Sequence, residues 1–283
     1  MKFWLMVPWT SAENMMAIAK AADERGFEGI MGADHGFIPQ SMAADYPYTD
    51  DGKPPISGDM PYPEVWTTIA AMAAVTKQIK FSTAVYVLPL RNPIEVAKAT
   101  GTIARISNNR LVLGAGVGWM KEEFDVYGEE FKTRGKRMNE CIEILRAIWA
   151  GGYVEYHGEH YDFAPLQIAP EPSEPVPIIL GGASKPALRR AGKYAQGWMG
   201  NGNTKDEMPE IFATLNQSRA EHNKTDEAFE IILAMKDNPS VDELKAYQAQ
   251  GATATVLGFP DHTMSVDQKV KFLDALVGYM GQF

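Results

Sequence analysis

Asp34 and His35 form an adjacent pair that could transfer a proton. They follow an apolar run, Phe27–Ala33, that is typical of a buried strand, so both side chains are expected where that strand ends. Histidine exchanges its proton near neutral pH, and a neighbouring carboxylate can tune it. A histidine that only caps a loop would give the same pattern. We favour a catalytic pair, because strand ends in α/β barrels gather catalytic side chains.

A second candidate is the run of alternating glycines at Gly114, Gly116 and Gly118, which ends the apolar strand predicted over Arg110–Gly114. Without a Cβ atom, a glycine lets a bound molecule come close to the backbone. The spacing differs from the dinucleotide pattern GxGxxG, and tight packing or a turn is the plainer interpretation. Trp119 follows at once, and we expect it to form a wall of the pocket.

The turn Gly181-Gly182-Ala183-Ser184 lies between a predicted strand and a helix that begins near Lys185. The free backbone N–H groups and positive dipole at a helix start attract phosphate. Ser184 could add a hydroxyl, and Arg189 or Arg190 a charge. An ordinary capped helix is the alternative, and we place phosphate binding slightly ahead of it.

Other polar and aromatic residues give weaker signals. The acidic side chains after Trp119 are most simply a solvated face, although one of them could meet a substrate: Glu122, Glu123, Asp125, Glu129 and Glu130. Four tryptophans could stack on a planar ring, namely Trp9, Trp66, Trp119 and Trp198. Trp66 lies on a helical stripe and is predicted to be core. The histidines show no HxH or HExxH spacing, so we expect no metal site.

The composition limits the class of partner. The 283 residues carry a net charge of -9, which argues against binding to nucleic acid or to an anionic membrane surface. Cys141 is the single cysteine and lies in a helical pattern, so we expect a buried thiol. No apolar run approaches the length of a membrane span, and Lys2–Pro8 suggests a first strand rather than a signal peptide. We therefore expect a cytoplasmic protein.

Strand and helix patterns alternate along the whole chain. Helical or loop patterns separate eight apolar runs that suggest strands. These runs are Lys2–Pro8, Phe27–Ala33, Ile79–Val87, Arg110–Gly114, Ile178–Leu180, Gly197–Asn201, Phe229–Met235 and Ala254–Gly258. This rhythm predicts an α/β fold, a (β/α)8 TIM barrel that forms one domain over residues 1–283. A doubly wound open sheet is the competitor. Two insertions are expected, a lid or binding loop at Gly36–Met60 and a β-hairpin at Tyr153–Ile168.

These motifs, in this order, resemble the luciferase-like monooxygenase superfamily, and most of all its F420-dependent oxidoreductase branch. The resemblance covers residues 1 to about 205 and rests on four stretches: ADHG, KQIKFSTAVYVLPLRNP with NRLVLGAGVGWMKEEFDVYG, RGKRMNECIEILRAIW, and PIILGGASKPALRRAGKYAQGWMGNG. It implies a barrel that binds either FMN or the deazaflavin coenzyme F420.

The resemblance also assigns residues. It implies that His35, beside Asp34, lies at the reactive edge of the ring. It implies a bulge in the third strand, often with a non-prolyl cis peptide, and this bulge would brace one face of the ring. It also implies that glycines of the fourth strand line the ring pocket. The turn after the fifth strand would bind the phosphate. The matching positions are Ser82, Thr83, Ala84, Val85, Gly116, Gly118, Gly181, Gly182, Ala183 and Ser184.

The leading hypothesis is therefore hydride transfer between bound F420 and a small organic substrate. His35 would donate a hydrogen bond or proton, Asp34 would orient or tune it, and Trp119 with Trp9 would exclude water. The nearest alternative is an FMN-dependent monooxygenase that takes reduced cofactor from a separate reductase. A metal-dependent barrel hydrolase and a flavin-binding protein without catalysis are further alternatives. Apolar outer helices suggest a homodimer.

Overall fold

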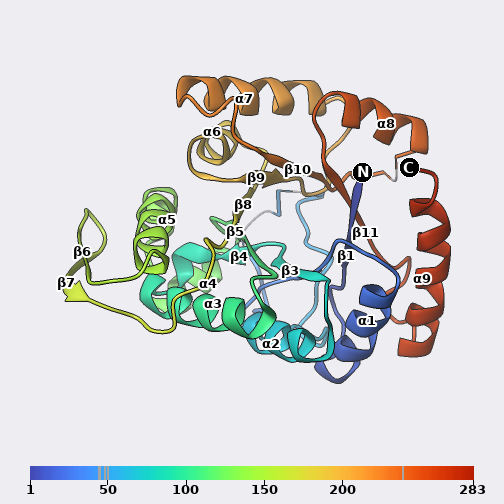
Figure 1. The fold of residues 1–283 in the computed structure, drawn as a ribbon, viewed down its shortest axis with the longest axis horizontal. Coiled ribbons are helices and arrows are strands. Elements are labelled where there is room, and N and C mark those ends of the chain that lie inside the picture. Colours follow the sequence, from blue (N-terminus) through green and yellow to red (C-terminus); the bar gives the residue numbers. More distant parts are fainter. Residues whose placement is uncertain (44–45, 48, 50, 238) are drawn as a thin grey trace.

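The computed structural model describes residues 1–43, 46–47, 49, 51–237 and 239–283. Within these residues, eight parallel strands close into a barrel (Figure 1): β1 (Lys2–Met6), β2 (Gly29–Gly32), β3 (Lys80–Thr83), β5 (Leu111–Gly116), β8 (Ile178–Gly181), β9 (Gly197–Met199), β10 (Glu230–Leu233) and β11 (Ala254–Leu257). The wall closes because β3 pairs with both β2 and β5. The predicted (β/α)8 barrel is confirmed, and the open doubly wound sheet is wrong.

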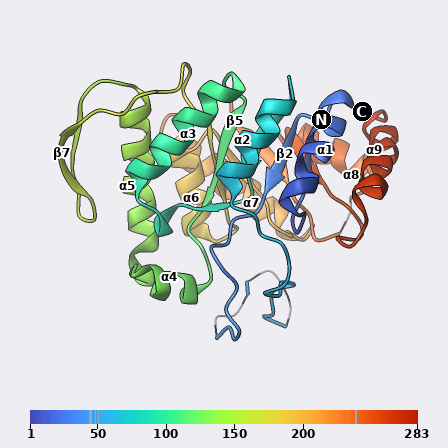
Figure 2. The same ribbon diagram turned by 90° about the horizontal axis from the view of Figure 1, so that it is seen from below.

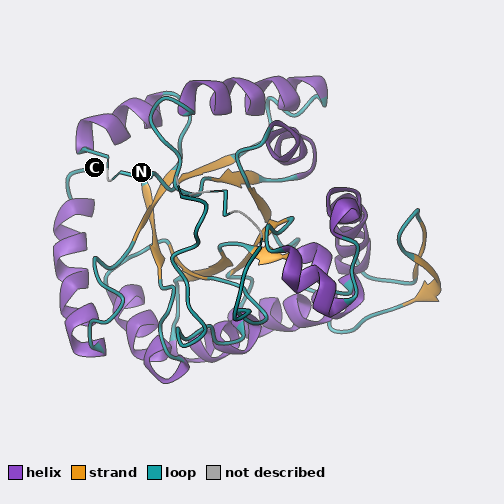
Figure 3. Ribbon diagram, turned by 180° about the vertical axis from the view of Figure 1, so that it is seen from behind, coloured by secondary structure: helices purple, strands orange, loops and turns teal. Residues whose placement is uncertain are grey.

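Helices surround this barrel on its outside (Figure 3). They are α1 (Ala12–Glu24), α2 (Val65–Val75), α3 (Pro93–Ser107), α4 (Lys121–Tyr127), α5 (Arg134–Trp149), α6 (Lys185–Tyr194), α7 (Met208–Glu221), α8 (Val241–Ala249) and α9 (Val266–Met280), with short 3-10 turns η1 (Leu88–Leu90) and η2 (Phe131–Thr133). A capping residue marks where helix α3 begins, because the Asn92 side chain accepts the N–H of Ile94 at 2.9 Å. None of the described helices combines the length and apolar character needed to span a membrane.

The core has two layers because successive side chains of a strand point to opposite faces. Phe3 and Leu5 of β1 pack outward with the helices, whereas Trp4 packs inside the barrel. Gly29 of the neighbouring strand makes room for that indole, since a Cβ there would lie 2.1 Å from the Trp4 ring. The other buried members of the interior cluster are Met31, Val112, Ile179, Met199, Ile232 and Ala254.

The third predicted strand, Ile79–Val87, is interrupted. It consists of β3 and a short β4 (Tyr86–Val87), and the peptide bond between Ala84 and Val85 is cis. The Ala84 N–H still donates to the Gly32 carbonyl at 2.8 Å, and β4 pairs with β5. The bulge that the family resemblance implied is therefore present at Ala84–Val85, beside the end of β2.

The acidic run after Trp119, predicted as a loop with a solvated face, is helix α4. The helix ends at Gly128, whose φ of 75° is the left-handed conformation that favours glycine. Its inner face buries Phe124 and also Glu123. The prediction was wrong here because one buried face of two residues is too short to give a clear helical pattern.

The long connection between β2 and α2 projects from the body on the same side as α4 (Figure 2). Ala44, Asp45, Tyr48 and Asp50 of the predicted Gly36–Met60 loop lie outside the described residues. The Ala43 N–H donates to the Glu122 carboxylate at 2.6 Å, so the loop is tied to α4. This side of the barrel is therefore the one that the insertion covers.

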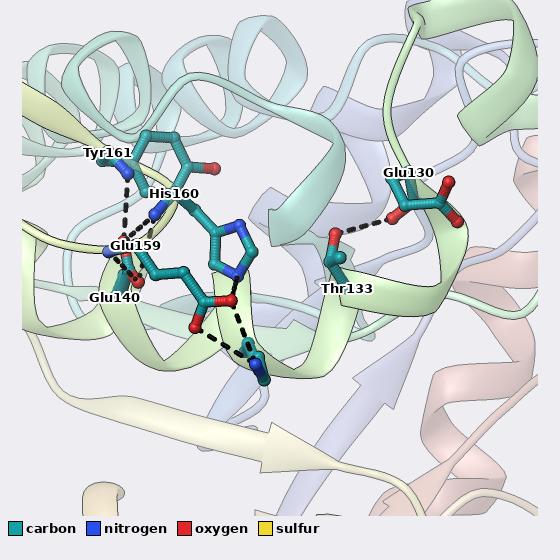
Figure 4. Close-up of polar contacts among 7 residues, drawn as sticks. Glu130, Thr133, Glu140, Glu159, His160 and Tyr161 are labelled. Atoms are coloured by element: carbon teal, nitrogen blue, oxygen red, sulfur yellow. Dashed lines mark hydrogen bonds and ion pairs between the residues drawn. The ribbon is translucent and has the colours of Figure 1, made fainter.

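The predicted hairpin is confirmed as β6 (Val154–His157) and β7 (Asp162–Leu166), which stand away from the ring of helices. Its turn is fixed to α5 by the Glu140 carboxylate, which accepts the backbone N–H groups of Glu159, His160 and Tyr161 at 3.0 Å each (Figure 4). The hairpin turn is thus held by a carboxylate of α5, and it lies away from the ends of the barrel strands.

Candidate functional site

His35 lies directly beyond β2, at the carboxyl end of the barrel. Its Nδ1 is 3.1 Å from the Glu123 carboxylate, whose other oxygen accepts the Gly36 N–H at 2.8 Å. The Glu123 side chain is only 2% exposed. An ionised carboxylate can only accept, so Nδ1 carries the proton of this contact and Nε2 is the ring atom that can serve a ligand.

Two aromatic rings pack edge-on against the imidazole of His35. Tyr62 lies 5.3 Å from it and Trp119 lies 5.9 Å from it, measured between ring centroids. Trp9, whose φ of 52° is left-handed, donates its indole N–H to the Tyr62 hydroxyl at 2.8 Å. Burial raises the pKa of Tyr62 to about 12, so its hydroxyl stays protonated. Trp119 and Tyr62 therefore flank the His35 imidazole, and the pocket wall expected at Trp119 stays a prediction.

The Asp34 carboxylate bonds to groups other than the His35 ring, although it still interacts with His35 electrostatically. No hydrogen bond joins Asp34 to His35 within the described part of the chain, because the Asp34 carboxylate instead accepts the Val87 N–H at 3.0 Å and Arg91 Nη2 at 3.2 Å. Burial raises the pKa of Asp34, while Arg91 and the Val87 N–H oppose that shift. Asp34 thus ties β2 to β4, and Glu123 takes the place beside His35 that Asp34 was expected to hold.

The four residues predicted to brace a ring divide into two pairs. Ser82 and Thr83 are fully buried, and the Thr83 hydroxyl donates to the Gly114 carbonyl at 2.5 Å. Ala84 and Val85 are half-buried and pack on the interior cluster of the barrel. A ligand at the mouth would therefore meet Ala84 and Val85, while Ser82 and Thr83 support the bulge from below.

Glycines on both sides make room for Val85. A Cβ at Gly116 would lie 2.5 Å from Val85 Cγ2, and a Cβ at Gly181 would lie 2.9 Å from Val85 Cγ1. Gly118 has a φ of 81°, and a Cβ there would lie 2.5 Å from Val87 Cγ1. Tight packing, the plainer of the two interpretations of these glycines, is confirmed. Its effect is to place the Val85 side chain across the barrel mouth.

The Gly181–Ser184 turn leads into α6 at the same end of the barrel. Gly182 has a φ of 105°, and its carbonyl accepts the Trp198 indole N–H at 2.9 Å. Trp198 is fully buried, so the expectation that it could stack on a ring is wrong. Ser184 is the N-cap residue, yet its side chain makes no capping hydrogen bond, and Ala183 is half-buried beside it. Pro186 has no N–H, so in the described part of the chain the N–H groups of Lys185 and Ala187 are the ones that the first turn of α6 offers to an anion.

The sequence missed or dismissed three residues that build the site: Tyr62, Arg91 and Glu123. A signal existed for Glu123, because Met120, Phe124 and Gly128 have the spacing of a short helix with an apolar face and a glycine stop. Trp66 is buried, as predicted. In the described ranges, no three His, Cys, Asp or Glu side chains gather as metal ligands would.

Comparison with known proteins identifies the family of this chain. The profile described as luciferase-like monooxygenase matches residues 1–258. This chain belongs to that family. Its members include flavin- and F420-dependent oxidoreductases and monooxygenases, so the family supports an enzyme with a flavin or deazaflavin cofactor.

Two relatives in sequence and one solved structure of the same fold show what this chain is similar to. An uncharacterized protein of Mycobacterium tuberculosis is 37% identical over 268 residues, which are 94% of this chain and 92% of the relative. The F420-dependent glucose-6-phosphate dehydrogenase of Amycolatopsis mediterranei is 28% identical over 190 residues, 66% of this chain and 52% of that enzyme. The structure of an F420-dependent secondary alcohol dehydrogenase with an F420-acetone adduct shares the fold with a TM-score of 0.77, at 16% identity over 97% of this chain and 98% of that one.

Proposed function

We propose that this protein transfers a hydride between bound F420 and a small organic substrate. The observation that carries the proposal is His35 at the end of β2, held through Nδ1 by the buried Glu123 beside the Ala84–Val85 bulge. The relative from Amycolatopsis mediterranei, named as F420-dependent, supports the choice of deazaflavin.

The residues at the mouth fit a flat ring with a phosphate tail. Ala84 and Val85 offer an apolar surface for one ring face, and the first turn of α6, with the unbonded Ser184 side chain, suits the phosphate. A bound deazaflavin would supply the hydride chemistry, which no side chain can provide.

His35 would hold or deliver a proton at Nε2 as charge develops on the substrate or the ring. Glu123 fixes the tautomer and the direction of the imidazole through Nδ1. Tyr62 and Trp119 shield the imidazole, whose side chain is only 12% exposed, and so keep water from the reacting atoms.

The second candidate is an FMN-dependent monooxygenase that receives reduced cofactor from a separate reductase. The family description favours it, since it names a monooxygenase. The same residues would hold the ring and the phosphate. The difference lies in oxygen use, because reduced FMN would react with oxygen, whereas reduced F420, which has a carbon in place of the flavin ring nitrogen N5, would not.

One titration separates these functions. Protein fluorescence and ring fluorescence are followed while F420 or FMN is added, and oxygen uptake is then measured with the reduced form of the ligand that binds. We expect F420 to bind, and reduced F420 to be oxidised by members of a panel of aldehydes, ketones and enones without oxygen uptake. Oxygen uptake that depends on reduced FMN would instead establish the monooxygenase. Tight binding without any substrate-dependent oxidation would indicate a cofactor-binding protein without catalysis.

A further inference from the structure

The hydroxyl of Tyr62 lies beside the proposed catalytic histidine and carries a proton that no described residue accepts. The Tyr62 ring packs edge-on against the His35 imidazole, with 5.3 Å between the ring centroids. The Tyr62 oxygen accepts the Trp9 indole N–H at 2.8 Å. A tyrosine hydroxyl can donate one hydrogen bond while it accepts another, and within the described residues no group accepts the Tyr62 O–H. This O–H can therefore serve a ligand.

Tyr62 differs in this respect from other tyrosines that are partly or fully buried. The Tyr156 hydroxyl donates to a carboxylate of α5 at 2.8 Å. Tyr86 is 5% exposed and packs in the outer layer of the core, and Tyr161 lies in the turn of the hairpin. Among the described tyrosines, only Tyr62 combines an unpartnered O–H with a ring contact to His35.

Trp9 orients the Tyr62 hydroxyl, and its own backbone is in an unfavourable conformation. Its φ of 52° is left-handed, which a bulky side chain rarely adopts. Residues held in such conformations gather at functional sites. Here the turn after β1 places the indole N–H on Tyr62 and the indole ring edge-on to His262, with 5.6 Å between the centroids. Because Trp9 occupies one lone pair of the oxygen, the Tyr62 O–H must point away from the indole.

The chemistry of this hydroxyl is that of a hydrogen-bond donor and not of an acid. Burial raises the pKa of Tyr62 to about 12, so its proton stays on the oxygen at neutral pH. His35 is different, because Glu123 holds its Nδ1 and leaves Nε2 to exchange a proton. Trp119 also flanks the imidazole, but among the described residues its indole N–H has no partner that orients it. His35 Nε2 and the Tyr62 O–H are thus two oriented groups that suit one substrate oxygen.

We infer that Tyr62 is a catalytic hydrogen-bond donor to the carbonyl oxygen of the substrate, and that Trp9 is its positioning residue. The inference rests on the proposed function and narrows its substrate class to aldehydes and ketones. In the reduction, the carbonyl carbon gains a hydride from reduced F420 and forms a C–H bond, while the π electron pair of the C=O bond moves to the oxygen.

The oxygen of the substrate then takes the Nε2 proton of His35 and becomes the hydroxyl of an alcohol. His35 regains a proton from solvent, which balances the proton that leaves the ring as F420 is oxidised. The Tyr62 O–H keeps its own proton and stabilises the negative charge that develops on the substrate oxygen. A phenylalanine at this position would shield His35 equally well, so the O–H is what separates a donor from a wall.

The first test is kinetic. Turnover of aldehydes and ketones with reduced F420 is compared between the natural chain, Tyr62→Phe and Trp9→Phe. Tyr62→Phe keeps the ring beside His35 and loses the O–H, so we expect kcat to fall about 10²-fold while F420 affinity and Tm stay unchanged. Trp9→Phe keeps the O–H but loses the group that orients it, so we expect a smaller loss of about tenfold. A Trp9→Phe variant that turns over as the natural chain does would remove Trp9 as the positioning residue.

The second test measures binding without turnover. Isobutyramide presents a carbonyl oxygen but is a poor hydride acceptor, and its dissociation constant is measured by protein fluorescence with and without oxidised F420. We expect Tyr62→Phe to weaken amide binding about tenfold, because one hydrogen bond to the carbonyl oxygen is lost. A ring that only excludes water would bind the amide equally well as tyrosine or phenylalanine.

Tyr279→Phe is the matched control. The Tyr279 side chain on α9 is also half-buried, and its hydroxyl donates to the Pro239 carbonyl at 3.2 Å. We expect this variant to turn over and to bind the amide as the natural chain does. Turnover and amide binding retained within about twofold in Tyr62→Phe, or equal losses in Tyr62→Phe and Tyr279→Phe, would overturn the inference and leave the proposed function intact.

The natural chain separates the inference from the proposed function. If it oxidises reduced F420 only with acceptors that lack a carbonyl group, the inference is wrong and the proposed function stands. If it binds no F420, or binds F420 without any substrate-dependent oxidation, the proposed function and the inference are both wrong.

Discussion

The two ends of the barrel use charged residues in opposite ways. At the amino ends of the strands, Lys2 pairs with Glu230 and Lys80 with Glu28, and all four side chains are between 25% and 45% exposed. They surround a cavity of about 90 Å³ whose deeper lining is apolar, with Trp4, Val112, Ile179 and Ile232. At the carboxyl ends, Glu123 and Asp34 are 2% and 8% exposed.

This difference in exposure indicates that the charged residues at the two ends of the barrel have different roles. The exposed pairs at the amino ends, here called the floor, link β1 to β10 across β11 and the start of β3 to the residue before β2, and each is worth little. The buried carboxylates at the rim each hold a second side chain, His35 or Arg91, and a backbone N–H in place. A charge is buried at such a cost only where its position matters, so we expect substitutions at the rim to act on function and those at the floor to act on stability.

The largest effect is expected at His35. His35→Ala removes the group that holds the proton at Nε2, so turnover should fall about 10²- to 10⁴-fold. Cofactor affinity should change little, because Ala84, Val85 and the α6 turn are untouched. Steady-state kinetics and fluorescence titration measure the two quantities. Unchanged turnover with the cofactor still bound would remove His35 from the mechanism.

Glu123→Gln should give the next largest effect. The amide keeps the shape but can accept only one of the two hydrogen bonds, and such bonds to a charged group are worth about 1.5–3 kcal/mol. Turnover should therefore fall about 10- to 100-fold. Asp125→Asn on the same helix is the control, since Asp125 is 58% exposed and pairs with Lys121. Equal behaviour of the two variants would show that Glu123 does not position His35.

Gly116→Ala tests the packing of Val85. The added Cβ would lie 2.5 Å from Val85 Cγ2, so Val85 must move, and we expect about tenfold weaker cofactor binding and a loss of about 1–3 kcal/mol of stability. Adding Val85→Ala should restore much of that stability. It should not rescue Gly114→Ala, whose Cβ would lie 1.8 Å from the Thr83 carbonyl oxygen. Thermal unfolding of the two double variants checks this contrast.

The smallest effect is expected at the floor. Burial by itself would raise the pKa of Glu230. Hydrogen bonds from Lys2 and Thr253 lower it by a larger amount, so the pKa of Glu230 lies below its ordinary value of 4.5. A lowered pKa in the folded state stabilises the protein above pH 4.5, and this contribution disappears as the pH falls through the folded pKa. Glu230→Gln should therefore lower Tm at pH 7 by an amount that corresponds to less than about 1 kcal/mol, and by less at pH 3.5. A larger loss at pH 3.5 than at pH 7 would contradict this sign.

Local pattern predicted most of the fold. Period-two and helical spacing placed the barrel strands, the hairpin and the helix starts, because these depend on residues near in sequence. The same reasoning identified His35, Trp119 and the Gly181–Ser184 turn as strand-end residues. It missed α4, whose buried face is short, and it paired His35 with the adjacent Asp34.

The sequence by itself determined that eight strands alternate with helices and which residues stand at the strand ends. Only the tertiary structure decided which of those residues meet. His35 and Glu123 are 88 positions apart, and Asp34 and Arg91 are 57 apart. The physical reason is that barrel closure sets these contacts: it brings separate βα loops to one rim, and neighbours in sequence, such as Asp34 and His35, can bond to different partners there.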